Sequence, residues 1–218
     1  MHGSSPILLT GFEPFGGEAL NPAAEIVRAL EGETIAGHRV AGAILPVAFA
    51  TTLTLLEDLL ARHQPTLVLA IGQAGGRACL GFERVAVNLV DARIADNEGL
   101  QPIDVAVVDH APAAYLTTLP VKAMVARAGA LGIPASLSMS AGSFVCNQVF
   151  YALAHLAATR QPALRTGFVH VPWLPEQAVG HAGEPSMALT TMVAGVRAAL
   201  ECALDTRTDL AVPGGTTH

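Results

Sequence analysis

Apolar positions in this chain follow two patterns, short continuous runs and repeats every three or four residues. The short runs are bounded by glycine, proline or polar residues, which is typical of strands buried on both faces. They predict strands at residues 7–10, 40–47, 67–71, 84–89, 135–139 and 166–171. The repeats predict helices at residues 48–62, 120–130, 143–158 and 187–204, and a further helix that starts at Asn21-Pro22.

Strands and helices therefore alternate along the whole chain. Such alternation predicts an α/β fold, in which helices cover both faces of a mainly parallel sheet. The glycine-rich segment 72–81 and the polar segment 91–104 are predicted to be irregular. No linker or repeat divides the chain, so we expect one domain over residues 1–205 and a flexible tail over residues 206–218.

Composition narrows the range of functions. Hydrophobic residues make up 51% and charged residues 14% of the 218 residues, which argues against disorder and leaves apolar surface for self-association. The net charge of -6, without a basic cluster, argues against a nucleic-acid partner. No apolar stretch approaches the roughly 20 residues needed to cross a bilayer, and residues 1–6 lack the pattern of a secretory signal.

The chain has three cysteines, Cys79, Cys146 and Cys202. An odd, low number argues against a disulfide scaffold, and none of them lies at metal-ligand spacing from another cysteine or a histidine. These features favour a protein of the reducing cytoplasm, without a structural zinc site.

Cys146 is the strongest candidate for chemistry. It lies between a predicted strand and a predicted helix, and Ser143 is a suitable N-cap, which would place Cys146 in the first helical turn. The free N–H groups and the helix dipole there favour an anion, so we expect a lowered thiol pKa and a nucleophilic thiolate. The alternative is a buried structural cysteine, which is the commoner role of a free cysteine.

His170 and Glu83 are candidate partners of this thiol. His170 lies near the carboxyl end of a predicted strand, where sites of α/β proteins form, and could serve as a base. Glu83 could orient a histidine ring. The alternatives are a core histidine and an ordinary ion pair between Glu83 and Arg84. The order Glu, Cys, His differs from the order Cys, His, Asn of papain-like enzymes.

Two loops could hold further polar groups. Residues 73–77 form a glycine-rich loop, but they lack the spacings of the common nucleotide-binding motifs, so phosphate binding is weakly indicated. Residues 91–97 could be a solvated turn, or they could bring Arg93 close to a developing oxyanion.

Eight strings occur in a fixed order between residues 8 and 177: LLTGFEPFGG with NPA, GQAGGR, ERVAVN, DARIADN, QPID, AAYLTTLP with KAM, SAGSFVCNQVFY and GFVHVPWLPEQ. As a set they are highly specific. In them the chain resembles pyroglutamyl peptidase type I, also called pyrrolidone-carboxylate peptidase, a family of cysteine peptidases. The resemblance implies a single α/β domain with a twisted mixed sheet, of the phosphorylase/hydrolase-like type.

The resemblance also implies roles for particular residues. It places the nucleophile at Cys146, the base at His170, the triad acid at Glu83 and an oxyanion-stabilising arginine at Arg93. Asp96 remains a rival for the acid. The implied pocket residues are Phe12, Phe15, Gln73, Ile94, Phe144 and Val145.

The implied activity is removal of an N-terminal pyroglutamyl residue from peptides through a thioester. Family members are commonly cytoplasmic homotetramers that need no metal or cofactor. The chain departs from the family pattern at Ala95, which replaces a proline, at Ala111, which replaces a glycine, and at Trp173, which replaces a tyrosine. Ala95 is expected to loosen the loop of Arg93, because proline restricts a loop and alanine does not.

Two other classes of function remain. A nucleoside phosphorylase or related nucleotide-binding enzyme would use the glycine loop at residues 75–76 for phosphate and would tolerate alkylation of its thiols. A non-catalytic binding protein would keep the fold without turnover, since function resides in the site and not in the fold.

Overall fold

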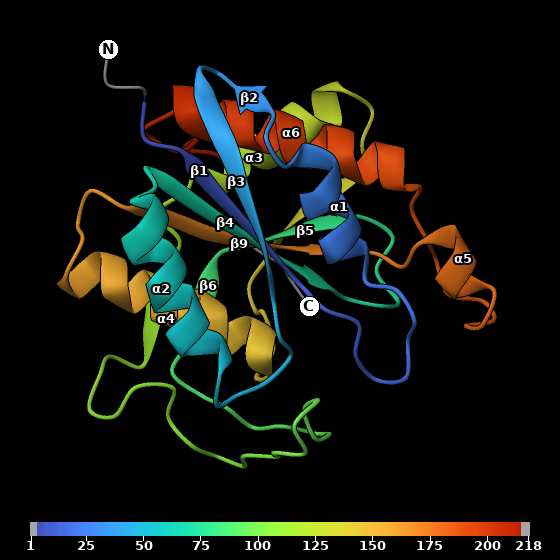
Figure 1. The fold of residues 1–218 in the computed structure, drawn as a ribbon. Helices are drawn as coiled ribbons and strands as arrows, with labels where there is room; N and C mark the ends of the chain where they lie inside the picture. The colour runs from blue at the N-terminus through green and yellow to red at the C-terminus, as the bar shows by residue number, and fades with distance from the viewer. Residues whose placement is uncertain (1–3, 215–218) are drawn as a thin grey trace.

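The computed structural model describes residues 4–214, and a seven-stranded sheet forms its centre (Figure 1). The strand order is β2-β3-β1-β4-β9-β5-β8. The strands are β1 (Ile7–Phe12), β2 (Thr34–Ile35), β3 (His38–Leu45), β4 (Leu67–Gln73), β5 (Leu80–Glu83), β8 (Ala135–Ser138) and β9 (Arg165–Val171). A separate antiparallel pair joins β6 (Val85–Val87) to β7 (Ala114–Leu116).

The main sheet is mixed, as the resemblance implied. The pairs β3–β1, β1–β4, β4–β9 and β5–β8 are parallel, whereas β2–β3 and β5–β9 are antiparallel. The reversal at β5–β9 sets Gly81 opposite His170 and Glu83 opposite Phe168. Side chains two positions apart on a strand share one face, so Glu83 and His170 lie on the same face of the sheet.

Helices cover both faces of the sheet, which confirms the predicted fold class. The helices α1 (Pro22–Leu30), α3 (Val121–Ala130) and α6 (Leu189–Asp205) pack on one face, and α2 (Thr52–His63) and α4 (Val145–Thr159) pack on the other. The short helix α5 (Pro175–Ala178) follows β9 at the margin of the molecule (Figure 1).

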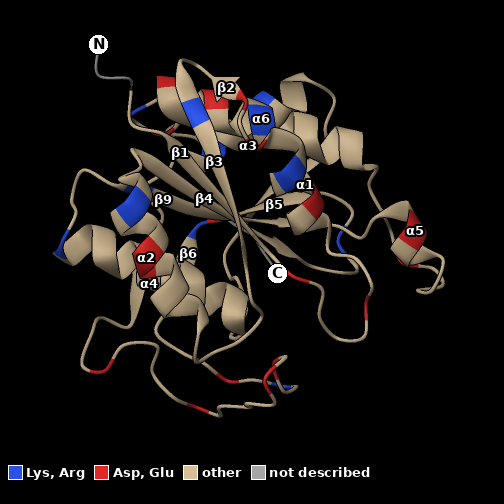
Figure 2. Ribbon diagram, viewed as in Figure 1, with Lys and Arg blue, Asp and Glu red and all other residues tan. Residues whose placement is uncertain are grey.

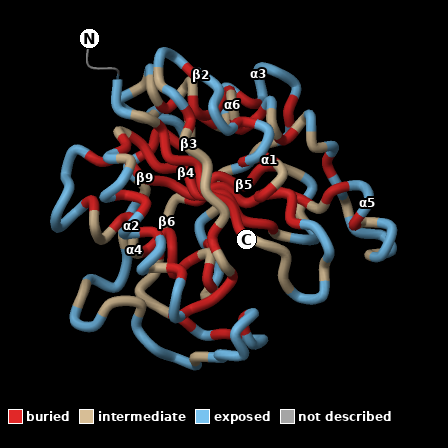
Figure 3. The backbone as a smooth tube through the Cα atoms, in the orientation of Figure 1, coloured by how far each residue is buried: buried red, intermediate tan, exposed pale blue. Residues whose placement is uncertain are grey.

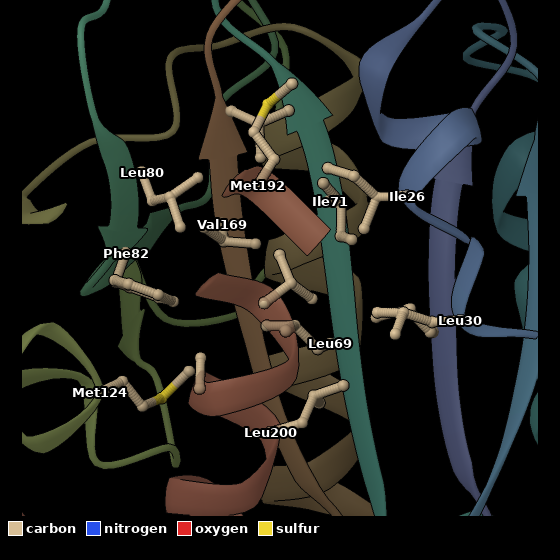
Figure 4. Close-up of a cluster of buried hydrophobic side chains, with 14 of the residues drawn as sticks. Ile26, Leu30, Leu69, Ile71, Leu80, Phe82, Met124, Val169, Met192 and Leu200 are labelled. Carbon is tan, nitrogen blue, oxygen red and sulfur yellow. The ribbon is translucent and has the colours of Figure 1, made fainter. Parts of the chain in front are cut away.

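The apolar run of β4 contributes to two hydrophobic cores. The first lies between the sheet and the helices α1, α3 and α6, and the second lies between the sheet and α2 and α4. Leu69 and Ile71 face the first core, and Val68 and Ala70 face the second. Figure 4 shows Leu69 and Ile71 beside Leu200 and Met192 of α6 in the first core. The central strands are almost entirely buried (Figure 3), as a continuous apolar run predicts.

The structure differs from the sequence prediction at the glycines of the central strands. Residues 72–81 were expected to be a loop, but β4 extends through Gln73 and β5 already begins at Leu80. Gly72 and Gly81 lie inside strands. Glycine is needed there because neighbouring side chains occupy the space that a Cβ atom would take. The predicted strand 84–89 is confirmed in shorter form as β6, which pairs with β7 outside the main sheet. The strands β2 and β7 and the helix α5 had no signal strong enough to predict them.

The predicted start of α1 is confirmed. The side-chain oxygen of Asn21 accepts a hydrogen bond from the Ala23 amide at 3.0 Å, and Pro22 is the first helical residue. The Asn21 amide group also donates to the Glu13 carbonyl at 2.9 Å. Asn21 therefore ties the loop that follows β1 to the beginning of α1.

After α6, hydrogen bonds tie Thr206 to β9 and Asp209 to α3. The Asp209 carboxylate accepts from the Lys122 and Ala123 amides at 3.2 and 3.0 Å, and Arg165 donates to the Thr206 carbonyl at 2.9 Å. Residues 215–218 of the predicted tail lie outside the described residues, and the boundary at residue 205 stays a prediction.

Charged residues lie mainly on the outer helices and loops, with both signs intermixed (Figure 2). No helix within residues 4–214 combines the length and the apolar character that crossing a membrane requires.

The close approach of α1 to β1 yields a prediction about stability. A side chain at Gly11 would lie 2.6 Å from the Ala23 carbonyl oxygen and 2.7 Å from its carbon, and backbone atoms cannot move aside. Gly11→Ala should therefore lower the free energy of unfolding by about 1–3 kcal/mol, as measured by urea denaturation.

Gly129→Ala in α3 is the matched control. An added methyl group there meets nothing within 4 Å, so this variant should gain up to about 1 kcal/mol from helix propensity. An equal change in both variants would contradict the assigned role of Gly11.

Candidate active site

Three elements bring Glu83, Cys146 and His170 together. His170 lies near the end of β9, on the face covered by α4, because its neighbours Val169 and Val171 face the opposite core. The antiparallel register then places Glu83 beside it. The Nδ1 atom of His170 lies 2.7 Å from the Oε1 atom of Glu83. The two residues are 5% and 0% exposed, so the hydrogen bond is shielded from water.

Cys146 is the second residue of α4. The helix begins at Val145 with Phe144 as its N-cap, so the prediction that Ser143 caps the helix is wrong. The Ser143 hydroxyl donates instead to the Asp91 carbonyl at 2.8 Å, and the Asp91 amide donates to the Ser143 carbonyl at 3.0 Å. The predicted position of Cys146 in the first helical turn is nevertheless confirmed.

Gly72 makes room for the thiol. A side chain at this position of β4 would lie 2.8 Å from the Cys146 sulfur and 2.8 Å from the Phe168 ring. The sulfur therefore rests directly on the backbone of β4, and the absent side chain explains why a glycine occurs inside a buried strand.

Cys146 and His170 line one cavity of about 250 Å³. The two side chains make no direct hydrogen bond in this structure, in keeping with the looser contacts of catalytic groups before substrate binds. The other lining residues are Phe15, Gln73, Asp91, Arg93, Ile94, Ala141, Ser143 and Phe144.

The cavity contains five of the further residues named from the sequence: Phe15, Gln73, Arg93, Ile94 and Phe144. Phe12 and Val145 do not line it. They are 2% and 1% exposed and lie in the core behind it. The Phe144 ring lies 6.3 Å from that of Phe15 and 5.1 Å from that of Phe49, centroid to centroid, and Phe49 had not been predicted.

The loop of Arg93 is fastened at both ends. The reciprocal bonds between Asp91 and Ser143 hold its beginning. At its other end, the Asp96 carboxylate accepts from the amides of Phe49, Glu98 and Leu100. Ala95 thus lies beside a residue that is fixed by several hydrogen bonds. Asp96 organises this loop, and the carboxylate that contacts His170 is that of Glu83.

Sequence reasoning assigned no role to Arg77. Its Nη1 atom donates to Glu83 Oε1 at 3.0 Å, so Arg77 and His170 share one carboxylate oxygen. The alternative interpretation, an ion pair of Glu83 with Arg84, is wrong, because Arg77 forms the ion pair with Glu83. Gly81 leaves the space that the Arg77 guanidinium occupies, and the only sequence signal was the position of Arg77 in the glycine-rich loop. Glu83 Oε2 is buried and has no partner within residues 4–214.

The predicted lowering of the thiol pKa is wrong for the free protein. Burial raises the pKa of Cys146 to about 12, and the nearby charge of Glu83 adds to this effect. A backbone hydrogen bond at the helix start and the charge of Arg77 oppose the rise, but they are smaller. Burial also lowers the pKa of His170, although Glu83 partly offsets this. Both shifts favour the thiol and the neutral imidazole over the charged pair in the free protein.

No group of three or more metal-ligating side chains gathers anywhere in residues 4–214. The polar groups of the cavity are suited to acyl transfer, which needs a thiol, a base held by a carboxylate, and donors for an oxyanion.

Comparisons with known proteins agree with this chemistry. A sequence model of the family described as pyroglutamyl peptidase matches residues 5–206. The pyrrolidone-carboxylate peptidase of Cupriavidus taiwanensis is 53% identical over 214 residues, which cover 97% of this chain and 99% of that protein. The corresponding protein of Bacillus cytotoxicus is 49% identical over 212 residues, with the same coverage of both chains.

The fold is also that of solved structures. The crystal structure of pyroglutamyl peptidase I from Bacillus amyloliquefaciens superposes with a TM-score of 0.94 at 39% identity, over 96% of this chain and 100% of that one. A mutant pyrrolidone carboxyl peptidase from Pyrococcus furiosus gives 0.89 at 41% identity, over 92% and 98% of the two chains.

The protonated resting thiol predicts a pH dependence of alkylation. Only the thiolate reacts with iodoacetamide, so the rate at Cys146 should rise about tenfold per pH unit from pH 7 to pH 10 without levelling off. An ordinary thiol levels off above its usual pKa of about 8.5. Mass spectrometry of the Cys146 peptide measures the rate, and the partly exposed Cys79 is an internal reference. A plateau that begins below pH 8 would instead indicate a thiolate at rest.

Proposed function

This chain belongs to the pyroglutamyl peptidase family, and we propose that the cavity at Cys146 is where it carries out the reaction of that family. The protein is a cysteine peptidase that removes an N-terminal pyroglutamyl (5-oxoprolyl) residue from peptides. One observation carries the assignment of the site: a thiol and a carboxylate-bound imidazole from separate elements line the same small cavity.

The chemistry of the substrate fits this cavity. A pyroglutamyl residue is a five-membered lactam with two apolar faces, one N–H group, one ring carbonyl and no free amine. The rings of Phe15 and Phe144 can cover its faces without adding polar groups that need partners, and Phe12 and Val145 support them from the core. The Gln73 amide can bind the polar edge of the lactam.

Attack begins from the neutral pair. The bond from His170 Nδ1 to Glu83 leaves Nε2 as the basic nitrogen, which accepts the Cys146 proton as the sulfur bonds to the pyroglutamyl carbonyl carbon. Arg93 and the free N–H groups at the start of α4 stabilise the oxyanion. Each such donor typically lowers the barrier by about 3 kcal/mol.

The imidazolium then donates its proton to the leaving nitrogen, the C–N bond breaks and a thioester remains on Cys146. Water loses a proton to His170 as its oxygen attacks the thioester carbonyl. When this second intermediate collapses, the C–S bond breaks, His170 returns the proton to the sulfur, and free pyroglutamate leaves.

The assembly and location of the enzyme are part of the proposal. We propose a homotetramer in the cytoplasm. Large apolar side chains are exposed on the surface, with Ile103 66% and Leu116 60% exposed, and burial against other copies would remove them from water. Cys79, Cys146 and Cys202 are free thiols, the form that a reducing compartment maintains. Light scattering of the purified protein measures the mass of the assembly.

The nucleophile is tested with a chromogenic pyroglutamyl anilide. Cys146→Ala should lose at least about 1000-fold in kcat, because no other group can form the thioester, whereas Cys79→Ala should keep wild-type turnover. Wild-type turnover should also be independent of phosphate, unlike that of a phosphorylase. Near-normal turnover by Cys146→Ala would remove Cys146 from the mechanism.

The orienting acid is tested by two isosteric changes. Glu83→Gln breaks the ionic contact with His170 and Arg77, so kcat should fall about 100-fold or more. Asp96→Asn alters only a loop carboxylate, so its loss should stay within about tenfold. Thermal denaturation controls for unfolding, and a larger loss in the Asp96 variant would reverse the assignment.

A further inference from the structure

Gln177 in the short helix α5 is held in one orientation by its surroundings. Its side-chain oxygen accepts from the Leu174 amide at 3.1 Å. Its two N–H groups are shared among three acceptors, Glu18 Oε2 at 3.0 Å, the Leu20 carbonyl at 3.2 Å and Gln73 Oε1 at 3.1 Å. A carboxylate and a carbonyl cannot donate, and a backbone amide cannot accept, so the Gln177 amide cannot flip, whichever way Gln73 points.

This orientation dictates that of Gln73. Both side chains are nearly buried, at 8% exposure for Gln73 and 7% for Gln177. Because Gln177 presents its nitrogen, Gln73 must present its oxygen in return. The Gln73 nitrogen is then left toward the cavity that Gln73 lines together with Cys146 and His170, and nothing within residues 4–214 accepts a hydrogen bond from it.

We infer that Gln177 is a positioning residue that sets the specificity of the site, by fixing the Gln73 amide as a hydrogen-bond donor to the ring carbonyl of the substrate. The inference rests on the proposed function of the cavity. Gln177 of α5 would thus influence specificity without touching the substrate. Through Gln73 it favours ligands whose ring carries a hydrogen-bond acceptor opposite the Gln73 nitrogen.

The segment around α5 is built to keep Gln177 in place. Glu18, which accepts from Gln177, also accepts from His181 Nε2 at 2.8 Å. The His181 ring stacks on Trp173 with the centroids 4.2 Å apart. The chain on both sides of α5 is thus tied to the loop between β1 and α1, which carries Phe15 into the cavity.

The ring carbonyl takes no part in bond breaking, so its contact with Gln73 is equally strong in the bound substrate and in the transition state. Loss of that contact should raise KM and leave kcat nearly unchanged. Damage to the fold near Cys146 or His170 would lower kcat instead. The split between KM and kcat therefore separates a positioning role from a merely structural one.

The test is a double-mutant cycle at pH 8 with a pyroglutamyl anilide, using Gln177→Glu, Gln73→Met and the double variant. The introduced carboxylate accepts but does not donate, so Gln73 turns its nitrogen away from the cavity and offers an oxygen to the ring carbonyl. We expect KM to rise about 10–100-fold in the single Gln177 variant with kcat within about twofold. In the Gln73→Met background the same change should alter KM by less than about twofold.

Controls make the outcome decisive. Gln161→Glu places the same change on an exposed residue after α4 and should leave KM unaltered. If Gln177→Glu does not fold, Gln177→Met replaces it, with an expected rise of about 3–10-fold in KM that also disappears in the Gln73→Met background.

Equal rises in both backgrounds, no rise, or a fall in kcat at constant KM would overturn the inference. These results are distinct from a failure of the proposed function, in which the wild-type protein would not hydrolyse the anilide at all.

Discussion

The buried hydrogen bond between Glu83 and His170 is the constraint on which the rest of the site depends. A fully buried carboxylate is costly unless it is paired. Here one oxygen serves both His170 and Arg77, and the antiparallel pairing of β5 with β9 sets that geometry. The antiparallel orientation of β5 within a mainly parallel sheet therefore brings Glu83, at the end of β5, next to His170 of β9.

Close packing fixes the other half of the site. The Cys146 sulfur packs on the glycine backbone of β4, and the desolvation that results raises the pKa of the thiol. A resting thiol of this kind is protected from adventitious reaction, since only a thiolate is strongly nucleophilic. In the proposed mechanism His170 therefore takes the proton from this thiol once the substrate is bound.

Features that depend on a regular pattern of burial could be predicted from the sequence, whereas features that depend on long-range contacts could not. The long helices and five strands of the central sheet, β1, β3, β4, β8 and β9, were predicted, because regular burial leaves a regular apolar pattern, whereas β2 and β5 were not. Gly72 and Gly81 were assigned to a loop, because glycine is common in flexible segments. In the structure both lie in strands, where Cys146 and Arg77 leave no space for a side chain. Ser143 was assigned as a helix cap on its residue type, and the structure uses its hydroxyl to hold Asp91. Local preference gave way to a long-range contact in each case.

The sequence by itself determined the fold class, the family and most of the named residues that line the cavity, because periodicity and specific strings are properties of the chain alone. Only the tertiary structure decided how those residues act on one another. It paired Glu83 with His170 and Arg77, occupied Asp96 in a loop, and gave Gln73 its orientation through Gln177. Charge burial and hydrogen-bond direction depend on atoms that lie far apart in the chain, and no local pattern encodes them.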